Sequence, residues 1–167
     1  MNLFVLLKMV PDTVEELNVA PDSPALDAEF LRFKLSDPDE HALEQALLLK
    51  EKYGGTVTVV ALDAPEVDDV LFTALAKGAT RAVKVGGDWS RLQSFAAGQI
   101  LAAFLKEAGP ALSADALVLL RSQAIDDLEG EIGPFLAVRA RIHGRHQHRD
   151  CHHGSSALGK NDPFVLG

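Results

Sequence analysis

The residues best suited to binding a ligand follow a short apolar segment in the second half of the chain. After residues 116–120 (ALVLL), hydrogen-bond donors and acceptors come from Ser122, Gln123, Asp126 and Asp127. If the apolar segment is a strand of a parallel sheet, this loop lies at the carboxyl edge, where backbone N–H groups can bind a nucleotide. A carboxylate in such a loop can also cap the next helix, so both roles stay open for Asp126 and Asp127.

The common signatures of nucleotide hydrolysis and of covalent catalysis are missing from the sequence. There is no GxxxxGK[ST] phosphate loop, and no GxGxxG follows the first apolar segment. His41 is the sole histidine before residue 140, and no nucleophile elbow or Ser-His-Asp arrangement accompanies it. These absences disfavour a hydrolase, although hydrolysis of a nucleotide with a metal at Asp126 and Asp127 stays open as one hypothesis.

Apolar segments alternate with segments of helical periodicity, which predicts an α/β fold. The expected strands are Leu3–Leu7, Val57–Leu62, Ala82–Val85 and Ala116–Leu120, and their composition is typical of parallel strands buried on both faces. The expected helices are Asp39–Tyr53, Pro65–Lys77, Ser90–Ala108 and Gly133–Arg139. Because a helix follows each strand, we expect right-handed crossovers and a doubly wound, mostly parallel sheet with helices on both faces.

The ends of two helices are marked by local signals. Asp37 as N-cap, Pro38 at the first helical position and Glu40 three residues after the cap predict a capping box. Gly78 is expected to end the next helix in a left-handed conformation.

One region interrupts the alternation. Between residues 12 and 35, the turn sequence PDSP at 21–24 separates Glu16–Val19 from Phe30–Leu35. We expect a small hairpin excursion after the first strand.

Composition and charge limit the class of protein. The chain has 167 residues, of which 47% are hydrophobic, enough for one domain with a core. A formal net charge of −8 argues against nucleic acid as a partner. No apolar run approaches the roughly 20 residues that cross a membrane, so we expect no membrane insertion and a cytoplasmic location, or the mitochondrial matrix in a eukaryote. A single cysteine, Cys151, excludes an internal disulfide.

Motifs spread over most of residues 3–139 resemble the beta subunit of electron-transfer flavoproteins, a family in the adenine-nucleotide-binding α/β superfamily that also contains universal-stress-protein-like folds. Each motif alone is modest, but their order and spacing match the family. They are LKMVPDT at residues 7–13, DEHALEQA at 39–46 with LKEK at 49–52, TALAKGATRA at 73–82, and QAIDD at 123–127.

The resemblance implies an electron carrier subunit without a reaction of its own. Such a subunit pairs with an alpha subunit to hold one shared FAD, and the pair carries electrons from flavin dehydrogenases to a quinone-linked oxidoreductase or a similar acceptor. The beta subunit also binds AMP, or a second FAD in its place. Thr13 matches a position near the flavin, with a simple turn residue as its alternative. The positions that match the family's nucleotide site are Leu6, Ser36, Asp37, Pro38, Asp39, Asp63, Arg121, Ser122, Gln123, Ala124, Ile125, Asp126, Asp127, Gly130, Glu131 and Ile132.

Several of these positions depart from the family pattern. Ser36-Asp37-Pro38 stands where Asn-Pro-Phe is typical, Arg121 replaces a glycine, and residues 130–132 (GEI) replace a run such as Asn-Gln-Thr. Acidic residues at a helix start repel a phosphate. Weakened AMP binding and another adenine ligand both stay open, as does a stand-alone adenine-nucleotide-binding or stress-response-like module.

The composition changes abruptly after residue 139, so we expect a nucleotide-binding domain over 1–139 and an irregular His/Arg-rich tail over 140–167. Five histidines join Cys151 within residues 143–153. A metal site, a disordered segment and a translational frame change are the competing explanations, and the spacing matches no standard zinc pattern. Family members continue with a further strand at this point, so we expect the edge of the fourth strand to be uncovered.

Overall fold

A mostly parallel sheet forms the centre of the molecule. The computed structural model describes residues 1–14, 17–19, 26–27, 31–89, 92–107, 116–125 and 130–139, together with the backbone of 144–145 and 164–166. Within these residues the sheet has the order β5-β4-β1-β6-β8-β7. The four predicted strands are present and run parallel to one another: β1 (Asn2–Leu7), β4 (Thr56–Leu62), β5 (Arg81–Val85) and β6 (Ala116–Leu120). The predicted burial on both faces is wrong for β5, which lies at the edge of the sheet and has no buried residue.

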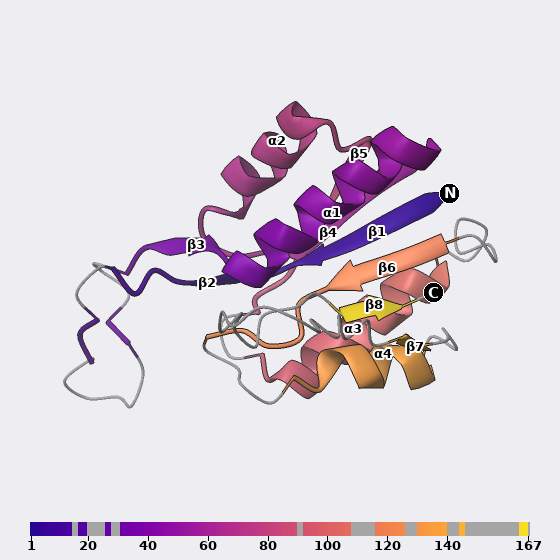
Figure 1. Ribbon diagram of the computed structural model, residues 1–167. Helices are drawn as coiled ribbons and strands as arrows, with labels where there is room; N and C mark the ends of the chain where they lie inside the picture. The colour runs from indigo at the N-terminus through magenta and orange to yellow at the C-terminus, as the bar shows by residue number, and fades with distance from the viewer. Residues whose placement is uncertain are drawn as a thin grey trace, which may run out of the picture.

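Helices cover both faces of the sheet, as predicted for a doubly wound α/β fold (Figure 1). On one face, α1 (Asp37–Tyr53) packs on β1 and α2 (Val67–Lys77) packs on β4 and β5, and both helices share a core with Leu3, Val5 and Leu7 of β1. On the other, α3 (Ser94–Glu107) and α4 (Ile132–Arg139) pack on Phe4 and Leu6. Successive residues of β1 therefore point into opposite cores, which explains why the whole strand is apolar.

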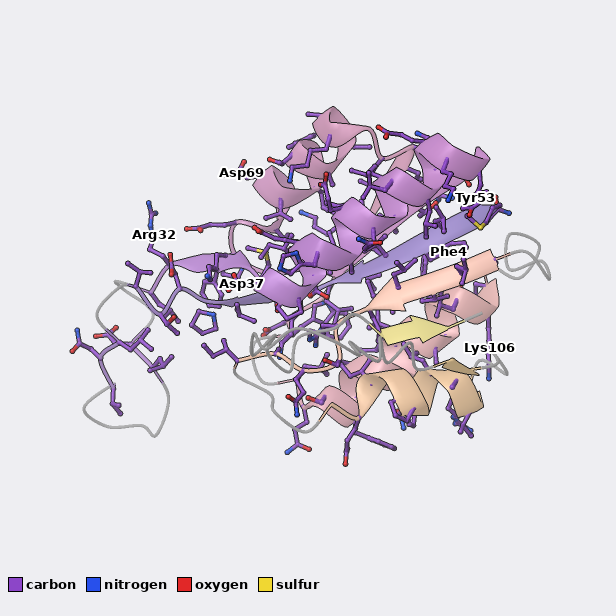
Figure 2. The ribbon with its side chains drawn as sticks, viewed as in Figure 1. Phe4, Arg32, Asp37, Tyr53, Asp69 and Lys106 are labelled. Carbon is purple, nitrogen blue, oxygen red and sulfur yellow. The ribbon has the colours of Figure 1, made fainter. Side chains whose placement is uncertain are left out.

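The start of α1 differs from the prediction. The N-cap is Ser36, Asp37 is already helical, and no side chain caps the helix, so the predicted capping box is wrong. The carbonyl of Ser36 accepts the N–H groups of Asp39 and Glu40, at 2.9 and 3.1 Å. Asp37, at the start of α1 (Figure 2), has its Oδ1 2.9 Å from Nζ of Lys34. Its carboxylate therefore pairs with a neighbouring cation and does not cap the helix.

Helix α2 also begins later than predicted. Glu66 precedes it in a left-handed conformation (φ 63°), so the helix starts at Val67 and not at Pro65. Its end is as predicted: Gly78 is left-handed (φ 117°), and its N–H binds the last turn. A glycine adopts this conformation without the steric cost that a Cβ would add.

The predicted hairpin is present, but its first strand comes earlier in the chain than the predicted segment Glu16–Val19. β2 (Met9–Pro11) pairs antiparallel with β3 (Phe33–Leu35), and an isolated bridge joins Val19 to Leu26 further out. Glu16 and Phe30 lie outside the described residues. Figure 1 shows this hairpin projecting away from the helices and the sheet, directly after β1.

The edge of β6 has a neighbouring strand, contrary to expectation. β8 (Phe164–Leu166) pairs antiparallel with β6, and β7 (Gly144–Arg145) pairs with β8. The polar composition of the tail hid this short apolar segment. Cys151 and the histidines of residues 143–153 lie outside the described residues. None of the described helices is long and apolar enough to cross a lipid bilayer.

Candidate functional site

The ends of β1 and β6 lie side by side at the carboxyl edge, next to the start of α1 (Figure 1). Asp39, in the first turn of α1, is completely buried at this junction. Its Oδ2 accepts the backbone N–H of Lys8 at 2.9 Å, and its Oδ1 accepts the backbone N–H of Arg121 at 3.2 Å. One carboxylate thus connects the start of α1 to the ends of two central strands.

Arg121 completes this arrangement with its side chain. It is 7% exposed, and its Nη1 lies 3.6 Å from Oδ2 of Asp39. Burial raises the pKa of Asp39 to about 6, even though the Arg121 cation and the two backbone donors oppose the rise. The structure therefore brings the predicted site residues Asp39 and Arg121 together, but it pairs them with each other. The guanidinium of Arg121 is directed to a carboxylate of the protein.

The loop that leaves β6 is closed at its base. We call its described residues, Arg121 to Ile125, the β6 turn. Gly130, where the loop approaches α4, is left-handed (φ 66°), and a Cβ placed on it would lie 2.7 Å from the carbonyl oxygen of Ser122. The two ends of the loop are therefore in contact. Ala124 is buried, whereas the Ile125 side chain is 58% exposed. Asp126 and Asp127 lie outside the described residues.

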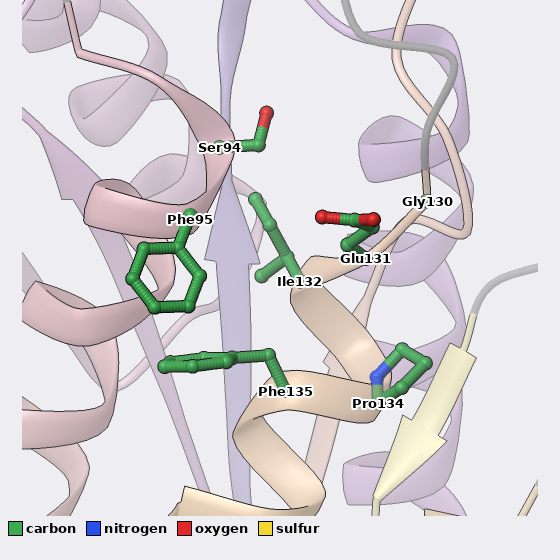
Figure 3. A pocket seen from close by; sticks show the side chains of 7 residues that line it. All are labelled: Ser94, Phe95, Gly130, Glu131, Ile132, Pro134 and Phe135. Carbon is green, nitrogen blue, oxygen red and sulfur yellow. The ribbon is translucent and has the colours of Figure 1, made fainter.

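A cavity of about 410 Å³ opens between the starts of α3 and α4. Figure 3 shows Ile132 between the Phe95 ring and the Glu131 carboxylate, with the Ser94 hydroxyl above them. The rings of Phe95 and Phe135 meet edge to face, 4.9 Å between centroids. The complete lining is Ser94, Phe95, Gly130, Glu131, Ile132, Pro134 and Phe135.

Three of these lining residues, Gly130, Glu131 and Ile132, were predicted as site residues. The other lining residues were missed. Ser94 and Phe95 come from the start of α3, far away in sequence, and Phe95 is 56% exposed. An aromatic side chain at a helix start was the available signal, but nothing in the sequence placed that helix start opposite α4.

The remaining predicted residues occupy different environments. Leu6 contributes only backbone to this edge, because its side chain packs in the core beneath α3 and α4. Ser36 and Pro38 are buried at the start of α1. Asp63 follows β4 as expected, but its carboxylate lies 3.7 Å from Lys84 Nζ, on the β5 side.

Thr13 lies in an exposed turn of the hairpin, where Oδ1 of Asp12 accepts the N–H of Val14 at 3.1 Å. This geometry is typical of an Asx turn. Across the part of the chain that the structure describes, no three His, Cys, Asp or Glu side chains are grouped to hold a metal ion. The proposed metal role of Asp126 and Asp127 concerns residues outside that part.

Comparison with known proteins is consistent with this geometry. The family described as "Electron transfer flavoprotein domain" matches residues 27–143. The chain is 36% identical over 143 residues to an electron transfer flavoprotein subunit beta of Clostridium acetobutylicum, covering 85% of this chain and 53% of that protein. It is 33% identical over 139 residues to the corresponding subunit of Bacillus subtilis, covering 82% of this chain and 51% of that protein.

A third relative carries a different name. The chain is 31% identical over 143 residues to "Acryloyl-CoA reductase electron transfer subunit gamma" of Anaerotignum propionicum, covering 85% of this chain and 52% of that protein. The chain thus spans about half the length of the curated relatives it matches. Because the family match covers most of the sequence and agrees with the observed α/β fold, the chain belongs to the electron transfer flavoprotein domain family.

Proposed function

We propose that this chain acts as the beta subunit of a heterodimeric electron transfer flavoprotein. In this role it binds AMP, or the adenosine part of a second FAD, at the carboxyl edge of the sheet. It helps an alpha subunit to hold the FAD that carries electrons from flavin dehydrogenases to a quinone-linked oxidoreductase. The observation that carries the proposal is the family match over residues 27–143, within which the β6 turn leaves the carboxyl edge.

The proposal assigns nucleotide binding to residues 1–139 and leaves 140–167 as a separate tail. The features that suit an adenosine are the closed base of the loop at Gly130, the exposed apolar side chain of Ile125 and the backbone of the β6 turn. Open α/β sheets bind ligands at such positions. The adjoining cavity, with Phe95 and Phe135, provides an apolar wall for a flat ring.

The charged side chains around the proposed site oppose strong binding of a phosphate. Glu131 lies at the cavity, Asp37 lies at the exposed start of α1, and the Arg121 cation already faces Asp39. A phosphate would depend on backbone N–H groups at the start of α4. We therefore expect AMP to bind this chain more weakly than a site with a free cation would allow.

In electron transfer, the role of this chain is to bind the adenine ligand and to orient it. FAD, when bound, accepts and releases the electrons. The described residues of this chain would position the adenine ligand and present the hairpin of β2 and β3 beside it. Without a reaction of its own, the protein would act as a carrier subunit and not as an enzyme.

Co-purification with an electron transfer flavoprotein alpha subunit tests the proposal. We expect a heterodimer with a 1:1 composition on size-exclusion chromatography and a flavin absorbance that depends on both chains. The alpha subunit alone serves as the control. A chain that binds AMP with neither partner nor flavin would instead favour the stand-alone adenine-nucleotide-binding module, and a chain that binds neither would refute both.

A further inference from the structure

The buried carboxylate of Asp39 lies where hydrogen bonds join the start of α1 to the end of β1. Lys8, directly after β1, donates its N–H to Asp39, and its carbonyl accepts the N–H of Ser36 at 3.1 Å. The carbonyl of Ser36 in turn accepts the N–H of Asp39. The first turn of α1 and the end of β1 are therefore joined in both directions. The second backbone N–H that this carboxylate accepts is that of Arg121, where the β6 turn begins.

We propose that Asp39 is the positioning residue of the β6 turn: its charged carboxylate holds the backbone of Arg121 against α1, and loss of that charge releases the turn and weakens adenine binding. Asp39 does not touch the ligand in this scheme, because it acts through Arg121. The effect on binding rests on the proposed function, whereas the effect on the turn rests on the contacts alone.

The strength of the hydrogen bond from the Arg121 N–H to Asp39 depends on the charge of the Asp39 carboxylate. Hydrogen bonds to an ionised acceptor are roughly twice as strong as those between neutral groups. The charged groups that face Asp39 are the Arg121 guanidinium after β6 and Lys8 after β1, and both favour the carboxylate. On its own helix, Asp37 and Glu40 are exposed to solvent. The pKa of about 6 puts the loss of charge just below neutral pH.

The position of Arg121 explains how a small change reaches the ligand. Its N–H is the first donor after the last residue of β6, so the bond to Asp39 Oδ1 sets the direction in which the chain leaves the sheet. Ser122 follows directly, and its carbonyl contacts Gly130 at the other end of the loop. A shift at Arg121 therefore moves both ends of the loop that would contact the adenine.

Amide hydrogen exchange measured by NMR on the full chain tests whether Asp39 holds the Arg121 backbone in place. Between about pH 7.5 and about pH 5, protection of the Arg121 amide should fall about tenfold in the wild type after correction for intrinsic exchange. Asp39→Asn should show low protection throughout. Glu44→Gln neutralises an exposed carboxylate on the same helix and should match the wild type. Because the wild-type titration needs no substitution, poor folding of Asp39→Asn would not prevent the test.

Adenosine binding tests the consequence, because adenosine lacks the phosphate that titrates in AMP. We expect its affinity to fall about tenfold over the same pH range in the wild type and to stay low and flat in Asp39→Asn. The inference would be overturned if protection of the Arg121 amide from exchange did not change with pH, or if it stayed high in Asp39→Asn. An adenosine affinity that does not depend on pH would overturn it as well. If protection changes as expected but adenosine never binds, the proposed adenine site is wrong while the hold on the turn stands.

Discussion

Nη1 of Arg121 lies 3.6 Å from Oδ2 of Asp39, and both side chains are buried, although 82 positions separate them in the sequence. The same arginine also donates its backbone N–H to the other carboxylate oxygen. Side chain and backbone of one residue therefore meet a single acceptor. This relationship fixes the end of β6 against the start of α1 and leads to the first two predictions.

Arg121→Met should destabilise the protein strongly. The substitution leaves the Asp39 carboxylate buried without its cation, which costs roughly 3 to 5 kcal/mol for a pair as buried as this one. Urea unfolding measures the loss. Combining Arg121→Met with Asp39→Asn should recover part of it, because no unpaired charge then remains. Losses that simply add in the double variant would show that the two side chains are not coupled.

Asp39 should make the whole protein more stable in mild acid than at neutral pH, even though its bond to Arg121 weakens there, because burying the charge costs more than Arg121 and the backbone donors return. Its pKa is raised in the folded state from 3.8 to about 6, so its contribution is fully present below pH 3.8 and is lost as the pH rises through about 6. The full difference is about 3 kcal/mol.

The free energy of unfolding of wild type minus that of Asp39→Asn isolates this contribution, since the other carboxylates are common to both proteins. The difference should grow as the pH falls from about 7 to about 4. A difference that shrinks on acidification would mean that the Arg121 cation lowers the pKa of Asp39 below its usual value.

Gly130→Ala should disturb the loop more than a matched glycine substitution does. Gly130 and Gly78 both have left-handed φ values, 66° and 117°. A Cβ at Gly78 meets only Cδ2 of Leu47, in ordinary contact at 3.8 Å, whereas at Gly130 it lies 2.7 Å from the Ser122 oxygen. We expect Gly78→Ala to cost about 1 kcal/mol and Gly130→Ala about 1 to 2 kcal/mol more. Equal losses in thermal or urea unfolding would argue against close contact between the ends of the loop.

Glu131→Gln should improve AMP binding. The carboxylate lines the cavity beside the start of α4, where a phosphate would lie under the proposed function. Removing it should raise AMP affinity about threefold at low salt and less at high salt. Titration calorimetry measures this, with Glu107→Gln at the far end of α3 as the control. Adenosine affinity should not change, and an equal gain for adenosine would place the effect away from the phosphate.

The sequence predicted the elements well where one signal dominated. The central strands are apolar at nearly every position because both faces are buried, and Gly78 ends its helix through its own backbone preference. The predicted N-cap of α1 was wrong because the helix begins one residue earlier, with Ser36 as N-cap, and the Asp37 carboxylate pairs with Lys34. The strand β8 was missed because its few apolar residues follow a polar stretch.

The candidate site was predicted by position but not by pairing. Asp39 and Arg121 were both named, yet no local pattern shows that one neutralises the other across the sheet. Likewise, Gly130 and Glu131 were named, but the cavity also needs Ser94 and Phe95 from another helix. Such pairings arise from tertiary packing, which brings distant segments together.

The contact between Gly130 and Ser122 has a consequence for how this scaffold can diversify. Because the two ends of the loop between β6 and α4 are in contact, a change in the residues between them has little effect on the strand before the loop or the helix after it. The segment between Ser122 and Gly130 can be substituted, lengthened or shortened at small entropic cost while the strands of the sheet keep their register. Under the proposed adenine site, ligand preference can thus change by substitution within one short segment, independently of the forces that keep the domain folded.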